Sequence, residues 1–169
     1  IQEYPLVQTA TWHGQGVPFV LAGSISVGQI DGAVLTLGEG VVLRFPPGAF
    51  LEVGYGGVDG GLVAVGSAAA PVVFESTLAA PAAGSWVGIV FRPDTMDGST
   101  LDHAVVRHAG EEMAYFSHAA VSLYDTGDAV SIDDTIFSEN ENADIYLGCG
   151  ATIGGNSGSP VINRKGEVV

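Results

Sequence analysis

Cysteine is almost absent from this chain, because Cys149 is the only one among 169 residues. An internal disulfide and any cysteine-rich metal cluster are therefore excluded. Basic residues are also scarce: 5 lysines and arginines stand against 19 acidic residues, which gives a formal net charge of -14 at pH 7. The resulting field repels phosphate backbones and anionic lipid, so we expect neither nucleic acid nor a membrane surface as a partner.

Long apolar runs are missing as well. No run approaches the roughly 20 residues that a membrane-spanning helix needs. The first residues, IQEYPLVQ, lack the basic region and the apolar core of a signal peptide. We therefore expect the sequence to be a mature or excised piece of a protein.

No window carries the apolar stripe of an amphipathic helix, and 25 glycines and 8 prolines interrupt nearly every candidate segment. Between them stand apolar runs of three to five residues, most densely over residues 34–74, where GEG, PPG, GYGGVDGG and SAAAP separate them. Such runs are typical of short strands joined by turns. The sequence predicts an all-β fold.

The alternation of side chains is clearest at VVLRF, where Val41, Leu43 and Phe45 share one face and Arg44 points to the other. Two-residue hairpin turns such as Asn-Gly are scarce, which favours a solenoid over a sandwich. Similar positions recur at suitable intervals: Leu37 to Leu62 is 25 residues, Leu123 to Ile145 is 22, and Ile132 to Ile153 is 21. The segments Phe137–Asn140 and Ile153–Asn156 also match, and they suggest stacked asparagines at turns.

The chain carries in order the segments VLTLGEGVVLRF, FLEV, GGLVAVGSAAAPVVFES, SWVGIVF, STLDHAVVRHAG and AVSIDDTIFSENENADIYL. This order, over residues 11–156, resembles right-handed parallel β-helix domains of the pectin-lyase-like superfamily. The resemblance implies one domain over 1–169 with a capping segment at 1–17, six or seven coils within 18–163 and a terminal segment at 164–169. It also implies a secreted or cell-surface bacterial protein. It implies little about activity, because the superfamily includes lyases, hydrolases, tailspikes and non-catalytic repeat domains.

Acidic residues supply the candidates for sugar chemistry. A hydrolase of this superfamily would use paired carboxylates, for which Asp133 and Asp134 are the match, although adjacent residues on a strand face opposite sides. A lyase would need calcium-binding carboxylates beside an arginine, for which Arg107 is the candidate. Possible calcium ligands are Asp102, Asp125, Asp128, Asp133, Asp134, Glu139 and Asp144, with Asp125, Asp128 and Asp133 foremost.

Histidines give a weaker alternative. A zinc site would draw on His103, His108 and His118, with Glu111 and Glu112 nearby, but such a site usually has three ligands that converge. Residues 109–117 form the longest interruption in the second half of the chain, and loops on a rigid scaffold concentrate ligand contacts. The candidates for contact with a ligand are Met113, Tyr115, Phe116 and His118.

The segment GNSGSPVIN at 155–163 is similar to the nucleophile segment of trypsin-fold serine peptidases. This resemblance implies Ser157 as nucleophile, with His13 and Asp59 upstream as its partners. Only 12 residues follow Ser157, so we expect the strands that complete that fold to be absent. His13 and Asp59 also lack the usual flanking residues.

We therefore expect a non-catalytic structural or carbohydrate-contacting β-helix domain of a larger extracellular or cell-surface protein, with calcium as the one possible cofactor. A polysaccharide lyase or glycoside hydrolase on the same fold is the first alternative, and the serine peptidase is the second. Residues 34–74 look like scaffold, and residues 86–144 are the expected location of any activity. The last coil needs a cover, which we expect from residues 163–169, a second copy or a neighbouring domain.

Overall fold

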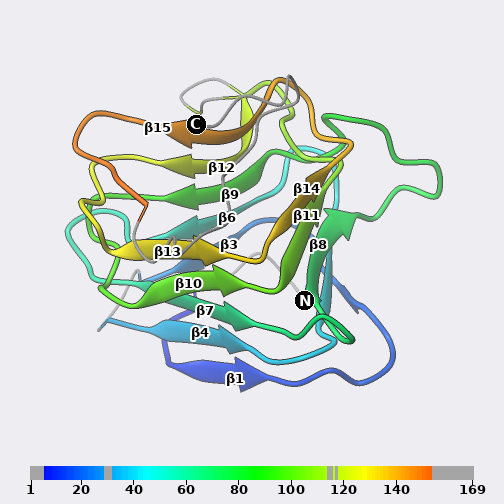
Figure 1. The fold of residues 1–169 in the computed structure, drawn as a ribbon, viewed down its shortest axis with the longest axis horizontal. Helices are drawn as coiled ribbons and strands as arrows, with labels where there is room; N and C mark the ends of the chain where they lie inside the picture. Colours follow the sequence, from blue (N-terminus) through cyan, green and yellow to red (C-terminus); the bar gives the residue numbers. More distant parts are fainter. Residues whose placement is uncertain (1–5, 29–31, 114–115, 117, 154–169) are drawn as a thin grey trace.

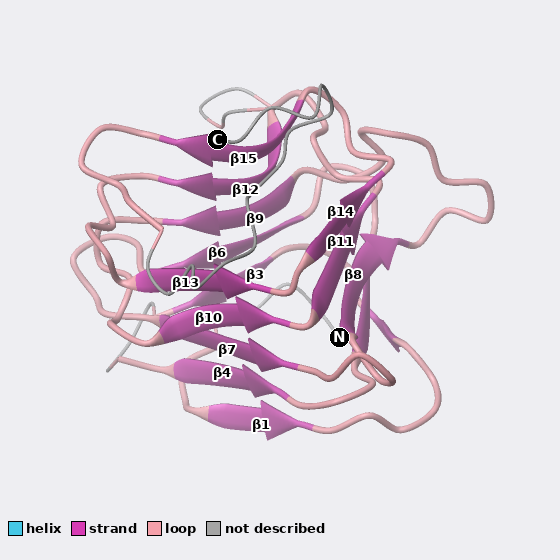
Figure 2. Ribbon diagram, in the orientation of Figure 1, coloured by secondary structure: helices cyan, strands magenta, loops and turns pink. Residues whose placement is uncertain are grey.

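The described part of the chain contains fifteen strands and no helix (Figure 2). The structure is a computed structural model, and it describes residues 6–28, 32–113, 116 and 118–153. Within these residues there is no helix long and apolar enough to cross a membrane. The predicted all-β fold is confirmed.

The strands form three five-stranded sheets in which all neighbouring strands run parallel (Figure 1). Sheet 1 contains β1 (Ala10–Trp12), β4 (Val34–Leu37), β7 (Gly61–Val65), β10 (Ser99–Asp102) and β13 (Val130–Asp133). Sheet 2 contains β2 (Phe19–Val20), β5 (Val42–Phe45), β8 (Val72–Ser76), β11 (Ala104–Arg107) and β14 (Ile136–Ser138). Sheet 3 contains β3 (Ile25–Val27), β6 (Phe50–Val53), β9 (Gly88–Phe91), β12 (Ala119–Leu123) and β15 (Ala143–Leu147).

Each coil gives one strand to each sheet, so the chain is a parallel β-helix solenoid, as predicted. The described residues form five coils, fewer than the six or seven predicted over 18–163, and residues 154–163 lie outside the described part. Loop length lowers the number of coils: Ile89 pairs with Leu51, which lies 38 residues earlier, because a long loop precedes β9. β1 lies inside the predicted capping segment, and it pairs with β4 as the first strand of sheet 1.

The predicted pairs between coils were wrong by two residues in two cases. Leu62 pairs with Leu35 instead of Leu37, and Ile145 pairs with Val121 instead of Leu123. Ile153, the third predicted partner, lies after the last strand. A shift of two residues keeps every side chain on the same face of a strand, so the apolar pattern cannot distinguish the two registers.

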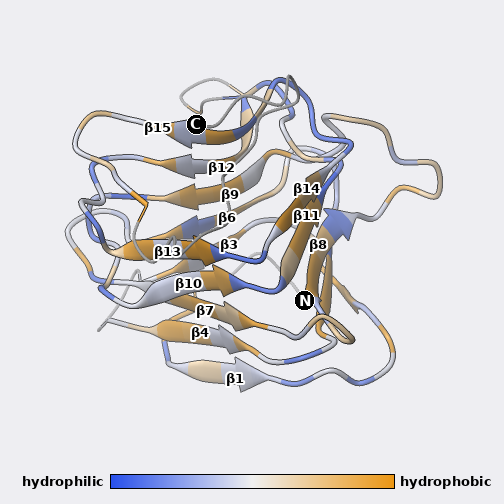
Figure 3. Cartoon of the chain, viewed as in Figure 1, coloured by the Kyte–Doolittle hydropathy of each residue, from blue (hydrophilic) through white to orange (hydrophobic). Residues whose placement is uncertain are grey.

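The core lies between the three sheets and follows the predicted alternation. Val41, Leu43 and Phe45 are fully buried, whereas Arg44 on the same strand is partly exposed. In Figure 3 the strands are mostly hydrophobic, and the chain becomes hydrophilic where β10 and β13 end. The largest core side chain is that of Trp86, whose ring stacks on Phe45 with centroids 4.4 Å apart.

Asn140 occupies a turn, and Asn156, its predicted partner in an asparagine stack, lies outside the described residues. The buried amide oxygen of Asn140 accepts a hydrogen bond from the Ala109 nitrogen at 2.9 Å, and its amide nitrogen donates to the Val106 carbonyl at 3.0 Å. The side chain therefore ties its turn to the backbone of the preceding coil. The prediction that the last coil is covered stays a prediction, because residues 154–169 lie outside the described part.

Candidate functional site

Aromatic side chains gather along sheet 3, from its strands and from the loops that flank them. We call this set the aromatic cluster, and its members are Phe50, Tyr55, Phe116, Tyr124 and Tyr146. They lie near one another because stacked coils place equivalent positions about 4.8 Å apart. The Tyr124 nitrogen, for example, donates to the Phe91 carbonyl of the preceding coil at 3.0 Å, which brings Tyr124 beside Arg92.

Arg92 lies at the centre of the aromatic cluster. Its guanidinium carbon is 5.0 Å from the ring centroid of Tyr124, 5.1 Å from that of Phe116 and 5.7 Å from that of Tyr55. Its Nε donates to Oε1 of Glu52 at 2.9 Å. A cation held by rings and one carboxylate fixes all of these groups in place.

Further ring contacts extend the cluster across the surface. Phe50 lies 5.0 Å from Phe116, and Tyr124 lies 5.6 Å from Tyr146, measured between ring centroids. Tyr55 is 54% exposed and Tyr146 is 41% exposed, so rings at both ends of the cluster are open to solvent. This is a preformed, amphipathic surface that presents aromatic faces together with a charged pair.

The loop that joins β11 to β12 packs beside the cluster. The carboxylate of Glu111 accepts a hydrogen bond from the Gly48 nitrogen at 2.6 Å, and the Glu111 nitrogen donates to the Trp86 carbonyl at 3.0 Å. This loop supplies Phe116, one of the predicted ligand contacts. Of the other predicted contacts, Met113 and His118 are half-buried and Tyr115 lies outside the described residues.

The sequence reasoning missed Arg92, Tyr124, Tyr55 and Tyr146. The sequence marks three of these positions, because Arg92 and Tyr124 directly follow the apolar ends of β9 and β12, and Tyr55 stands two residues after β6. No such mark exists for Tyr146. Recognising that these positions are neighbours requires the coil lengths. Those lengths vary with the loops, so the sequence alone did not align them.

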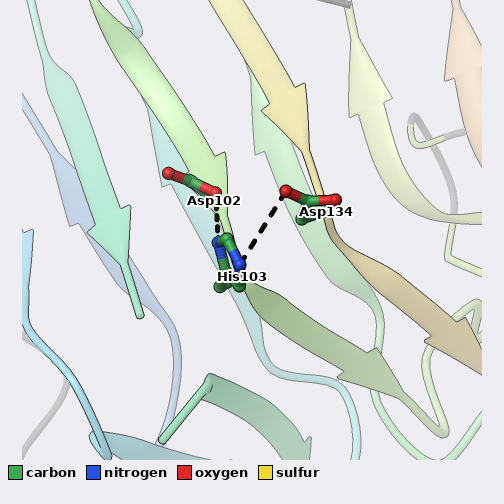
Figure 4. A group of neighbouring side chains, drawn as sticks. All are labelled: Asp102, His103 and Asp134. Atoms are coloured by element: carbon green, nitrogen blue, oxygen red, sulfur yellow. Dashed lines mark hydrogen bonds and ion pairs between the residues drawn. The ribbon is translucent and has the colours of Figure 1, made fainter. Parts of the chain in front are cut away.

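A second group lies at the corner between sheets 1 and 2 (Figure 4). Ligand-type atoms of Asp102, His103 and Asp134 all lie within 4.8 Å of one another. Nδ1 of His103 is 2.6 Å from Oδ1 of Asp102, and its Nε2 is 3.8 Å from Oδ2 of Asp134. Among the described residues no other set of three acidic, histidine or cysteine side chains converges this closely.

Most of the predicted calcium ligands therefore lie outside this converging group. Asp125 and Asp128 are exposed in the turn before β13, and Asp133 ends that strand without joining them in a converging group. Of the three histidines proposed for zinc, only His103 belongs to the converging group. His108 is instead buried beside Glu139, with 2.9 Å between Nε2 and Oε2.

The predicted catalytic residues come from different elements of the fold, apart from the neighbours Asp133 and Asp134. Asp134 has a φ of 42° and begins the turn after β13, and Arg107 pairs with Glu75 on sheet 2. His13 follows the end of β1, whereas Asp59 precedes the start of β7, so they flank opposite ends of sheet 1. Ser157 lies outside the described residues.

The outer face of sheet 2 carries a ladder of charges. Arg44 and Glu75 are register partners on β5 and β8, and their Nε and Oε1 atoms are 2.7 Å apart. Arg107 on β11 bonds the other oxygen of Glu75 through Nε at 2.9 Å and through Nη2. A groove with a volume of about 310 Å³ lies between this ladder and residues 16–18. The carboxylate of Glu75 on β8 therefore links this strand to its two neighbours, β5 and β11.

Burial alone would raise the pKa of Glu75, but the hydrogen bonds and charges of Arg44 and Arg107 outweigh it and hold the pKa below its ordinary value of 4.5. A lowered pKa in the folded state stabilises the protein above the pKa of the unfolded chain, and this contribution is lost as the pH falls through the folded value.

We expect Glu75→Gln to lower the free energy of unfolding at pH 7 by about 1 kcal/mol, because both arginines are partly exposed. The difference from the wild type should shrink as the pH falls below 4.5, the ordinary carboxyl value. Urea unfolding at a series of pH values measures it. Glu39→Gln, at an exposed turn, is the matched control; a difference for Glu75→Gln that stays constant down to strongly acidic pH contradicts the account.

A scan against protein-family models matched no family, and searches of curated proteins and of solved structures returned no similar protein. The architecture therefore rests on the structure itself.

Proposed function

We propose that this chain is a non-catalytic β-helix domain of a secreted or cell-surface protein, and that it contacts carbohydrate through the aromatic cluster. In architecture it resembles the repeat domains of the pectin-lyase-like superfamily. The observation that carries the proposal is the arrangement of Tyr55, Phe116 and Tyr124 around Arg92.

The chemistry of the cluster suits a sugar. Pyranose rings present a face of C–H groups that packs on an aromatic ring, and hydroxyl groups around the edge that bond to charged side chains. Tyr55 and Tyr146 offer exposed rings, and the guanidinium of Arg92, whose side chain is 18% exposed, offers N–H donors between them. Since the net charge of -14 repels polyanions, we propose a neutral polysaccharide as the ligand.

A non-catalytic role is supported by where the charged groups lie. Among the described residues Arg92 is paired with Glu52 and Arg107 is paired with Glu75, and neither arginine forms an ion pair with Asp133 or Asp134. A lyase or hydrolase would need such groups to converge on one sugar ring.

Retention of the protein on neutral polysaccharides tests the proposal, together with a glycan array. We expect Tyr55→Ala and Tyr146→Ala each to weaken binding about threefold to tenfold. Val20→Ala on sheet 2 removes side-chain atoms at 54% exposure, the same as for Tyr55, and should leave binding unchanged. Equal retention of all variants, or no retention of the wild type, sinks the proposed ligand class.

A degradation assay with and without calcium tests the non-catalytic part. We expect no new reducing ends and no unsaturated products under either condition. Product that accumulates in proportion to the protein concentration would show that the domain is an enzyme.

A further inference from the structure

The corner between sheets 1 and 2 brings together one imidazole and two carboxylates. His103 is the single residue between β10 and β11, and Asp134 is the first residue after β13. Because the coils stack, these two turns are neighbours: the His103 nitrogen donates to the carbonyl of Asp133 at 3.2 Å. Figure 4 shows the imidazole between the carboxylates of Asp102 and Asp134, which come from successive coils.

The two ring nitrogens of His103 face different carboxylates. Nδ1 is 2.6 Å from Oδ1 of Asp102, a distance at which an N–H donates to the carboxylate. A neutral imidazole has only one N–H, so the other nitrogen then presents its lone pair. That nitrogen, Nε2, faces Oδ2 of Asp134 at 3.8 Å. A lone pair and an anionic oxygen that face each other repel, and a cation placed between them would be attracted to both.

We propose that a divalent transition-metal ion of the zinc class binds between Nε2 of His103 and the carboxylate of Asp134. Asp102 would hold Nδ1–H, as carboxylates do behind metal-bound histidines, and thereby fix the tautomer that leaves Nε2 free to ligate. Imidazole nitrogen suits this class of ion, whereas calcium takes six to eight oxygen ligands. The proposal is independent of carbohydrate binding.

The distances fit this ion closely. Two ligand atoms that each lie about 2.1 Å from zinc at a tetrahedral angle are about 3.4 Å apart. The distance of 3.8 Å between Nε2 of His103 and Oδ2 of Asp134 must therefore shorten by about 0.4 Å. Asp134 is 61% exposed and its side chain is free to make this shift. The exposure of His103, at 33%, leaves room for water molecules to complete the coordination.

A proton on Nε2 of His103 would compete with the metal ion for the position between this nitrogen and Asp134. A doubly protonated His103 would pair with both carboxylates and leave no ligand for a metal. The test must therefore distinguish metal binding from simple protonation.

Isothermal titration of Zn²⁺ into the tag-free chain at neutral pH makes this distinction, in a Cys149→Ser background because an exposed thiol also binds zinc. We expect one saturable site that is lost in His103→Asn and strongly weakened in Asp134→Asn. Asp102→Asn should weaken it by about 10- to 100-fold. Asparagine is chosen because His103 and Asp134 have φ values of 48° and 42°, which asparagine tolerates.

Two further measurements keep the result interpretable. The ¹⁵N resonance of His103 Nε2 should shift on addition of Zn²⁺ while Nδ1 keeps its proton, and Zn²⁺ should raise the melting temperature of the parent chain but not of folded His103→Asn. Asp97→Asn, at an exposed carboxylate outside the group, should bind as the parent does. No saturable binding at millimolar Zn²⁺, binding that persists in His103→Asn, or an imidazole that stays doubly protonated in the presence of zinc overturns the proposal.

Discussion

We expect Trp86→Ala to lower the free energy of unfolding by about 3–5 kcal/mol, among the largest effects of any single substitution in this chain. The Trp86 side chain is 0% exposed, and its ring lies at 9° to that of Phe45, one coil earlier. Its Nε1 donates to the Arg107 carbonyl of the following coil at 2.8 Å. Alanine would leave a cavity and remove a contact to each neighbouring coil.

Urea unfolding measures this loss, and two variants divide it. Trp86→Phe keeps an aromatic ring on Phe45 but leaves the Arg107 carbonyl without its donor, for which we expect about 1–3 kcal/mol. Trp12→Ala removes the same side-chain type from the first coil, where Trp12 is only partly buried against Phe19 at 5.1 Å. If Trp12→Ala and Trp86→Ala cost the same, the middle of the stack is not the stable centre that its burial indicates.

The fold was predictable because its signals are local. Alternation in VVLRF placed Leu43 and Phe45 inside, and the glycine and proline turns limited every strand to a few residues. Register was not predictable, since a shift of two residues preserves the apolar face, and so Leu62 was matched to Leu37 instead of Leu35. The number of coils is hard to read from the sequence for a related reason, because loops of unequal length hide the repeat.

The candidate site was predictable only in part. The loop before β12 was found from its length, and it does bring Phe116 to Arg92. Residues 34–74 were predicted to be scaffold, and residues 86–144 were predicted to carry any activity. The aromatic cluster and its charged pair draw on both stretches. Glu52 and Tyr55 come from the first of these stretches and meet Arg92 from the second. Contacts between coils depend on register, which is the quantity that the sequence leaves open.

The second large effect is expected at Arg92, whose replacement by alanine should lower the free energy of unfolding by about 3 kcal/mol. The side chain of Glu52 is only 9% exposed, and Arg92 is its ion-pair partner at 2.9 Å. Removing the guanidinium leaves a carboxylate with little access to water, and it also removes the cation from three aromatic rings. Thermal and urea unfolding should both register the loss, and Glu52→Gln/Arg92→Ala should recover part of it.

A volume-conserving double substitution separates the two roles of this pair. Replacing a buried ion pair by uncharged side chains of similar size is often neutral for stability, so we expect Glu52→Gln/Arg92→Met to unfold close to the wild type. If the pair also orients a sugar, this stable variant should still lose retention on neutral polysaccharide. Full retention by the stable double variant would show that Arg92 serves the fold alone, and that any ligand binds through the exposed rings of Tyr55 and Tyr146 without it.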